Sequence, residues 1–281
     1  MRTLLLILVA TPLLAGWLRL EPAETPARAN LQGIWDRVDA GGGPPVQFYY
    51  FHTDDSGLFR FGSTALNHTE MFQTRWKWSG LELAFRKTGE RHVTRVREKT
   101  DREGRRVLIL ESDPRNGGKK TRYRRRAEGG PRLTATAEDD RRDPFARMWM
   151  HRRQLPSGVT DFRIYQFRPA GENRHGEGWY HYGDFDEWTT ESLQYYRGER
   201  GLHLRFVQRG EDAFTTASIR DGRKQKVLRL DADPRYFGRG SDYLDVGPNL
   251  MTAGERPAFG AFGPLVLSTE TPLDSPDTTP E

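Results

Sequence analysis

The sequence contains an internal repeat, and this repeat limits the possible folds more than any single motif does. Three pairs of similar segments occur in the same order, two of them 121 residues apart and the third 120 residues apart. The pairs are Gly57–Gly62 with Gly178–Gly183, Gly80–Phe85 with Gly201–Phe206, and Val107–Arg115 with Val227–Arg235. Three matches at almost one spacing indicate two copies of one structural unit. The chain of 281 residues is long enough for two domains, each with its own core.

Both copies have the alternating pattern of β-strands. In the segments that begin at Leu81 and Leu202, every second residue is apolar, which places the apolar side chains on one face of a strand. The predicted strands include Met71–Trp78, His92–Glu98, Ser192–Tyr196 and Ala213–Arg220. Turns rich in Gly, Asp and Asn follow at short intervals. Many short strands joined by tight turns predict an all-β, antiparallel fold in which each copy closes into a barrel or forms a sandwich.

The N-terminal segment is typical of an export signal. Residues Thr3–Leu18 form an apolar stretch after Arg2, and Ala27-Arg28-Ala29 gives an A-x-A-like cleavage site. The stretch is short for a membrane span, but the segment before the cleavage site is long and contains proline, so a membrane anchor formed by residues 3–18 is the alternative. In both cases the globular part is expected in the periplasm or outside the cell.

The predicted domain organisation follows from the repeat and from two segments without apolar periodicity. Gly129-Gly130-Pro131 is followed by the charged run Glu138–Asp143, and the C-terminal residues are acidic and rich in Thr and Pro. Such segments do not bury enough apolar surface to fold. The predicted parts are a signal peptide or anchor (1–29), the first β unit (30–127), a linker (128–144), the second β unit (145–267) and a disordered tail (268–281).

The composition excludes several kinds of chemistry. The chain has no cysteine, so disulfides, a thiolate nucleophile and Cys-ligated metal sites are excluded. The formal charge of +5 permits an anionic envelope surface as a partner without requiring a polyanion. The basic run Lys119–Arg126 contains an aromatic residue and could follow a nucleic-acid backbone. A solvated strand edge explains the same run, and export makes nucleic acid an unexpected partner.

Each copy begins with a tryptophan, Trp35 in the first and Trp149 in the second. The segment Gly33-Ile34-Trp35 resembles the Gly-x-Trp opening of lipocalin-like domains, in which the tryptophan of the first strand plugs one end of a barrel. The order of an aromatic strand, a glycine turn, a Gly-x-aromatic pattern and two alternating strands is also similar to that superfamily. The resemblance covers residues 30–126 and 145–247, although Trp149 has no glycine two residues before it. It implies two tandem lipocalin-like β-barrels.

The resemblance also implies an enzyme as an alternative, because tandem lipocalin-like proteins include hydratase-like and cyclase-like enzymes of bacterial secondary metabolism. No catalytic motif of those enzymes can be placed on this sequence. The densest group of acid/base residues contains His181, Tyr182 and Asp184, which are the catalytic candidates, with His181 directed into a cavity beside Trp179. A solvated histidine next to a strand explains the same residue without chemistry. The spacing is not that of a zinc site, so no metal is predicted.

Asp113 and Asp233 recur in the two Asp-Pro-Arg segments, each with another acidic residue two positions before it. Paired carboxylates can do acid/base work or bind calcium. A turn explains them without chemistry, because an Asp side chain accepts hydrogen bonds from nearby backbone N–H groups and Pro sets the chain direction. Since a catalytic site seldom occurs twice in one chain, the turn is favoured.

The chain has seven Trp, ten Tyr and fifteen Phe. Most are expected in the cores, and the predicted ligand-binding residues are Trp76, Trp78, Trp179 and Trp188. The favoured function is an exported, non-enzymatic protein without a cofactor. It would bind an apolar or amphipathic small molecule, or an envelope partner, at a barrel mouth or in the groove between the domains. The alternatives are an enzyme that acts on a hydrophobic substrate and a structural envelope protein with filled barrels, and the barrel interiors distinguish them.

Overall fold

The computed structural model of the chain describes residues 30–38, 46–126, 143–171 and 173–248. The predicted signal peptide or anchor, most of the predicted linker and the predicted tail lie outside the described residues. Within the described ranges, no helix has the length and the apolar character needed to cross a membrane.

The described part is all-β, as the alternating pattern predicts, and its strands form one large antiparallel sheet. The first nine strands are β1 (Gly33–Arg37), β2 (Val46–Phe51), β3 (Ser56–Gly62), β4 (Leu66–Lys77), β5 (Gly80–Phe85), β6 (Arg91–Thr94), β7 (Val96–Thr100), β8 (Arg106–Asp113) and β9 (Lys119–Arg125). The others are β10 (Arg147–Gln154), β11 (Thr160–Phe167), β12 (His175–Asp184), β13 (Glu187–Arg197), β14 (Leu202–Phe206), β15 (Glu211–Thr215), β16 (Ala217–Asp221), β17 (Lys226–Leu230) and β18 (Ser241–Pro248). A short 3-10 turn, η1 (Pro114–Asn116), separates β8 from β9.

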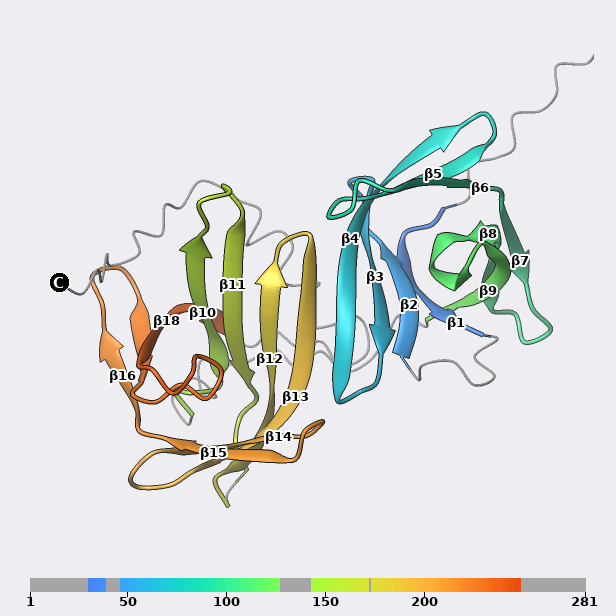
Figure 1. Ribbon diagram of the computed structural model, residues 1–281. Coiled ribbons are helices and arrows are strands. Elements are labelled where there is room, and N and C mark those ends of the chain that lie inside the picture. The colour runs from blue at the N-terminus through green and yellow to red at the C-terminus, as the bar shows by residue number, and fades with distance from the viewer. Residues whose placement is uncertain (1–29, 39–45, 127–142, 172, 249–281) are drawn as a thin grey trace, which may run out of the picture.

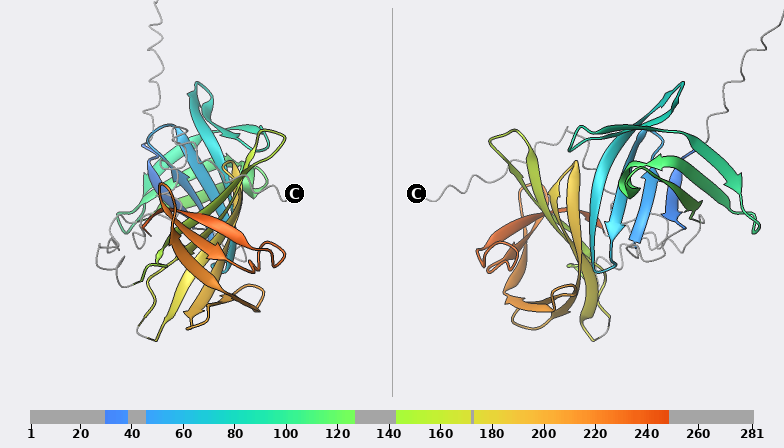
Figure 2. Two further views of the ribbon diagram at one scale, coloured as in Figure 1. Left: turned by 90° about the vertical axis from the view of Figure 1, so that its left-hand side faces the viewer. Right: turned by 45° about the vertical axis from the view of Figure 1, so that its right-hand side comes forward.

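The strands form two halves that lie next to each other, β1–β9 and β10–β18 (Figure 1). β1 pairs with both β2 and β9. The strand order of the first half is therefore β7-β8-β9-β1-β2-β3-β4-β5-β6. In the same way, β10 pairs with both β11 and β18. The strand order of the second half is β16-β17-β18-β10-β11-β12-β13-β14-β15. Each half is a strongly curved sheet (Figure 2).

Two predicted strands are divided, and the largest extensions are at the starts of β4 and β13. The segment His92–Glu98 is split at Arg95, because β6 pairs with β5 whereas β7 pairs with β8. Ala213–Arg220 is split in the same way into β15 and β16. β4 and β13 begin at Leu66 and Glu187, before the predicted starts, because their first residues pair with β3 and β12 and also with each other across the junction between the halves.

The β4–β13 ladder joins the two halves, and the two strands lie side by side in the middle of the molecule (Figure 1). The paired segments are Leu66–Glu70 and Glu187–Glu191. Beyond them, the N–H of Met71 donates to the carbonyl oxygen of Asp186 at 2.8 Å. Backbone hydrogen bonds therefore set the register between the halves, in addition to side-chain packing.

Each half has an aromatic interior. Trp35 and Trp149 are fully buried, and each indole N–H donates to the carbonyl oxygen four residues earlier, Leu31 at 2.6 Å and Phe145 at 3.0 Å. The interior of the first half also contains Tyr49, Phe51, Phe59, Phe72, Leu81, Leu83, Phe85, Leu108, Leu110 and Tyr123. The interior of the second half also contains Tyr165, Phe167, Tyr180, Leu193, Tyr195, Leu202, Leu204, Phe206, Leu228, Leu230 and Tyr243.

A third core, the junction core, lies between the halves. It consists of Ile34, Phe48, Leu58 and Met71 from the first half and Met148, Met150, Phe162, Ile164 and Trp188 from the second. Alternate residues of the same strands point into the interiors, so that Phe48 belongs to the junction core whereas Tyr49 belongs to the interior of the first half. The strands at the junction are therefore apolar on both faces, and separation of the halves would expose one of these faces to water.

Candidate functional site

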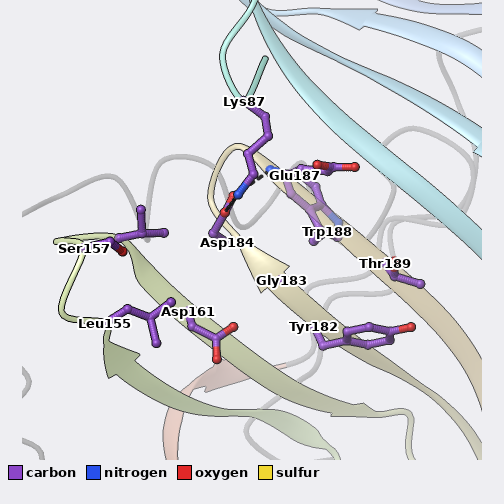
Figure 3. A pocket seen from close by; sticks show the side chains of 11 residues that line it. Lys87, Leu155, Ser157, Asp161, Tyr182, Gly183, Asp184, Glu187, Trp188 and Thr189 are labelled. Atoms are coloured by element: carbon purple, nitrogen blue, oxygen red, sulfur yellow. Dashed lines mark hydrogen bonds and ion pairs between the residues drawn. The ribbon is translucent and has the colours of Figure 1, made fainter. Parts of the chain in front are cut away.

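An open hollow lies where turns of both halves meet (Figure 3). Its volume is about 420 Å³, which is within the range of small-molecule sites. The β10–β11 and β12–β13 turns of the second half form much of its wall, and Lys87 reaches it from the β5–β6 turn of the first half. The lining residues are Lys87, Leu155, Ser157, Val159, Asp161, Tyr182, Gly183, Asp184, Glu187, Trp188 and Thr189. We name this feature the junction hollow.

Three residues singled out in the sequence meet in the junction hollow: Tyr182, Asp184 and Trp188. Tyr182 packs partly against the interior of the second half. Trp188 belongs to the junction core, where its ring centroid lies 6.4 Å from that of Phe162. Trp188 is only 5% exposed and Tyr182 is half-buried, so the apolar part of the wall consists of a small part of each ring and of the exposed Val159.

Asp184 is held in place by three donors. Its Oδ1 accepts the N–H groups of Asp186 and Glu187, both at 2.9 Å, and its Oδ2 pairs with the ammonium group of Lys87. Burial alone would raise the pKa of Asp184, but these hydrogen bonds outweigh burial and hold the pKa below its usual value. The hydrogen bond to Asp184 raises the pKa of Lys87. Neither group exchanges a proton near neutral pH, so the pair presents charge and fixes the turn but is unsuited to acid/base catalysis.

The wall of the junction hollow carries more negative than positive charge. Asp161, Asp184 and Glu187 are acidic, and Lys87 is the one basic residue among the lining residues. Asp161 lies 3.4 Å from the guanidinium group of Arg153, which is largely exposed and does not line the hollow. A ligand with a positive charge therefore complements this wall better than an anion does.

His181 points away from the junction hollow, on the opposite face of β12 from Tyr182. It is fully buried, with Nδ1 2.9 Å from Oγ1 of Thr190 and Nε2 3.1 Å from Oε1 of Gln166. Burial is the main cause that places the pKa of His181 well below its usual value, and the nearby Arg60 acts in the same direction. The imidazole is neutral at neutral pH and has no access to a ligand in the hollow.

The other three predicted tryptophans do not line the junction hollow. Trp76 is half-buried against the interior of the first half, and Trp78 at the β4–β5 turn is 99% exposed. Trp179 is half-buried, with the guanidinium group of Arg168 5.4 Å from its ring centroid. Of the four predicted ligand-binding residues, the structure therefore places Trp188 alone in this hollow.

Asp113 and Asp233 are fully buried. Oδ1 of Asp113 accepts the N–H of Arg115 at 3.0 Å, which is the contact expected of a turn. The same carboxyl group accepts the hydroxyl groups of Tyr49 at 2.9 Å and Tyr123 at 2.5 Å. Burial is the main cause that raises the pKa of both tyrosines, and the Asp113 carboxylate raises it further. Both hydroxyl groups therefore stay protonated and donate hydrogen bonds to the carboxylate.

Asp233 has the same set of partners in the second half. It accepts the N–H of Arg235 at 2.9 Å and the hydroxyl groups of Tyr165 at 3.0 Å and Tyr243 at 2.5 Å. Sequence reasoning explained the turn but missed these tyrosines, because each comes from a different strand. A signal was present: in each copy a tyrosine stands on the second strand and another on the last strand of the predicted unit. Each buried Asp–Tyr cluster thus joins its Asp-Pro-Arg turn to two strands of its own half, β2 and β9 in the first and β11 and β18 in the second.

Within the described residues, no group of three or more His, Cys, Asp or Glu side chains is arranged to hold a metal ion. Comparison with protein-family models, with curated proteins and with solved structures gave no match to this chain.

Proposed function

We propose that this chain is an exported, non-enzymatic binding protein made of two lipocalin-like halves. Its ligand, an amphipathic small molecule with a cationic group, occupies the junction hollow. The observation that carries this proposal is the composition of the hollow wall, in which Tyr182 and Trp188 lie beside Asp161, Asp184 and Glu187. Aromatic rings accept the apolar part of such a ligand, and the surplus of carboxylates accepts its charge.

Paired contacts support the proposal of two related halves. Besides the two Asp–Tyr clusters, Arg115 and Arg235 each lie 3.6 Å from an aromatic ring centroid, that of Phe85 and that of Phe206. Each arginine also forms ion pairs with two glutamates of its own half. The ladders of both halves also begin and end at corresponding strands, β7 and β6 in the first half and β16 and β15 in the second, so the two halves share one strand order.

The filled interiors are those expected of the structural envelope alternative, and they leave the space between the halves, rather than the inside of either half, as the place for a ligand. In the first half, the ring centroids of Tyr49 and Phe59 are 4.7 Å apart, and those of Tyr49 and Tyr123 are 5.1 Å apart. In the second half, the ring centroids of Tyr165 and Tyr180 are 4.8 Å apart. Rings at these separations are in contact, so they occupy the space that an open lipocalin-like barrel would offer to a ligand.

Catalysis is the alternative, and the contacts of its candidate residues favour binding. Asp184 is fixed by Lys87 and two N–H groups, and His181 is buried on the other face of its strand. A general base must reach the substrate and must be able to take up a proton near the working pH. Neither residue meets both requirements in this arrangement.

The test is a titration of the intact chain with dodecyltrimethylammonium and, separately, with dodecyl sulfate, both below the concentration at which they form micelles. Calorimetry and tryptophan fluorescence should detect the cation and not the anion. Glu187→Gln should weaken binding of the cation by about fivefold, since a partly exposed ion pair contributes about 1 kcal/mol. Glu177→Gln, which removes the same charge from an exposed position of β12 outside the hollow, is the matched control and should have no effect.

Equal binding of both detergents, or equal weakening by the two substitutions, would show that the signal comes from general surface charge or from nonspecific apolar contact. Failure of both detergents to bind would refute the proposed ligand class.

A further inference from the structure

The outer face of the second half carries two parallel rows of side chains on β12–β15. The first, which we name the aromatic row, consists of His175, Tyr196, His203 and Phe214. The second, the polar row, consists of Gln194, Arg205 and Asp212. In each row, every residue is directly opposite the next one on the neighbouring strand. Because side chains two positions apart share a face of a strand, both rows point to the same side of the sheet.

The rings of the aromatic row form a continuous series. The ring centroids are 4.7 Å apart between His175 and Tyr196, 5.9 Å between Tyr196 and His203, and 4.8 Å between His203 and Phe214. His175 and His203 are exposed, and half of the surface of Phe214 is in contact with solvent. The row spans four strands, or about 14 Å at the usual strand spacing of about 4.8 Å.

The fold does not require aromatic residues at these positions. The residues 121 positions before Tyr196, His203 and Phe214 are Arg75, Glu82 and Val93. These three are also directly opposite one another, on β4, β5 and β6. The corresponding ladder of the first half thus forms with a charged pair and a valine. Sheet formation therefore does not explain why the second half has aromatic residues at these positions.

A hollow of about 440 Å³ follows the two rows, and the residues of both rows line it. This second hollow lies on β12–β15. Strands β12 and β13 also border the junction hollow, but the two hollows share no lining residue. The second half therefore has a separate surface recess in which a row of rings lies beside a row of hydrogen-bonding groups.

We infer that the aromatic and polar rows bind an uncharged glycan chain. The C–H face of a sugar ring packs on an aromatic ring, while its hydroxyl groups pair with amide, guanidinium and carboxylate groups, and here these two kinds of group stand side by side. The rings recur at intervals close to the strand spacing, which is also close to the repeat of an extended chain of linked sugar rings. Successive rings of the row can therefore accept successive sugars.

Other occupants fit the rows less well. A polyanion would meet one arginine and one aspartate in the polar row, which gives no net positive charge. A β-strand of a partner could add to this sheet at β15, which ends the ladder, but there it would not cover the rings of His175 and Tyr196, because β13 and β14 each have a ladder on both sides. A purely apolar ligand would remove Gln194, Arg205 and Asp212 from water without giving them hydrogen bonds.

Affinity electrophoresis of the intact chain in gels that contain a neutral polysaccharide tests this inference. The gels contain hydroxyethyl cellulose, soluble xylan or galactomannan in turn, and DNA and polygalacturonate are the anionic comparisons. At least one neutral glycan should retard the protein, while the anionic polymers should not. Phe214→Ala and His203→Ala should each reduce the retardation at least fivefold, because each removes one ring of the row. Val93→Ala, at the partly exposed position 121 residues before Phe214, is the matched control and should leave the retardation unchanged.

Lack of retardation by every neutral glycan would overturn the inference, as would equal loss in the Val93→Ala variant or stronger retardation by the anionic polymers. The melting temperature of each variant is measured in parallel, and a variant that has lost its fold is replaced by His203→Gln, which keeps a polar side chain and removes the ring. Glu187→Gln in the junction hollow should not alter glycan retardation, so failure here is distinguishable from failure of the proposed small-molecule site.

Discussion

Removal of one tyrosine hydroxyl from a buried Asp–Tyr cluster should cost far more than removal of another hydroxyl in the same interior. In the Tyr243→Phe variant, Asp233 keeps Tyr165 and the N–H of Arg235 but loses the donor 2.5 Å from its Oδ2. Asp233 is fully buried, so water cannot replace the lost donor without opening the sheet. A hydrogen bond to a buried carboxylate contributes about 1.5–3 kcal/mol, and we expect the free energy of unfolding to fall by that amount.

Tyr180→Phe is the matched control, because Tyr180 lies in the same interior and its hydroxyl has no hydrogen-bond partner among the described residues. Urea unfolding followed by circular dichroism measures both variants, and the melting temperature of Tyr243→Phe should fall by about 3–12 °C. Tyr123→Phe should have a similar effect through Asp113 in the first half. If Tyr243→Phe costs no more than Tyr180→Phe, the Asp–Tyr clusters do not stabilise the sheet as argued above.

Three further predictions concern stability. The pKa of His181 is lowered in the folded chain, so below a pH of about 6.5 the unfolded chain binds a proton that the folded chain does not. The free energy of unfolding should therefore fall by up to about 1.4 kcal/mol for each unit by which the pH is lowered, and urea titrations at several pH values should show that His181→Gln removes this component. Gly183→Ala should lower the free energy of unfolding by about 1–3 kcal/mol more than Gly210→Ala does. Both residues have positive φ, but only at Gly183 would a Cβ lie 2.4 Å from the carbonyl oxygen of Glu187, so equal losses would contradict a steric cause. Residues 143–267 expressed alone should bind the dye anilinonaphthalene sulfonate more strongly than the full chain, since they expose their side of the junction core, and weak binding would show that this face is covered in another way.

The sequence predicts the strands better than it predicts how the halves meet. Apolar alternation located most strands, because one face of each is buried. The first residues of β4, Leu66–Glu70, and of β13, Glu187–Glu191, are mostly polar and give no such signal. They pair on both sides, with β3 and β12 of their own halves and with each other, and the pairing with each other joins residues more than a hundred positions apart in the chain. Tertiary pairing of this kind overrides local preference.

The same limit applies to the candidate site. Tyr182, Asp184 and Trp188 lie close together in the sequence around one hairpin, so they could be grouped from the sequence alone. Lys87 could not be added, because its turn approaches that hairpin only when the β4–β13 ladder has formed. His181 was grouped with Tyr182 although adjacent residues of a strand face opposite ways, and the structure separates them accordingly.

The β4–β13 ladder also decides how the junction hollow can respond to a ligand. Two domains on a flexible linker can close over a ligand like a hinge, whereas here backbone hydrogen bonds cross the boundary directly beside the hollow. A slip by one residue in this ladder would move Lys87 away from Asp184 by about 3.3 Å and turn the side chains of the slipped strand to the opposite face. The hollow is thus formed during folding, so a ligand of the proposed class would not have to meet the cost of ordering its two sides. Association should therefore follow simple one-step kinetics, with selectivity that comes from the fixed spacing of the wall groups rather than from a closing motion.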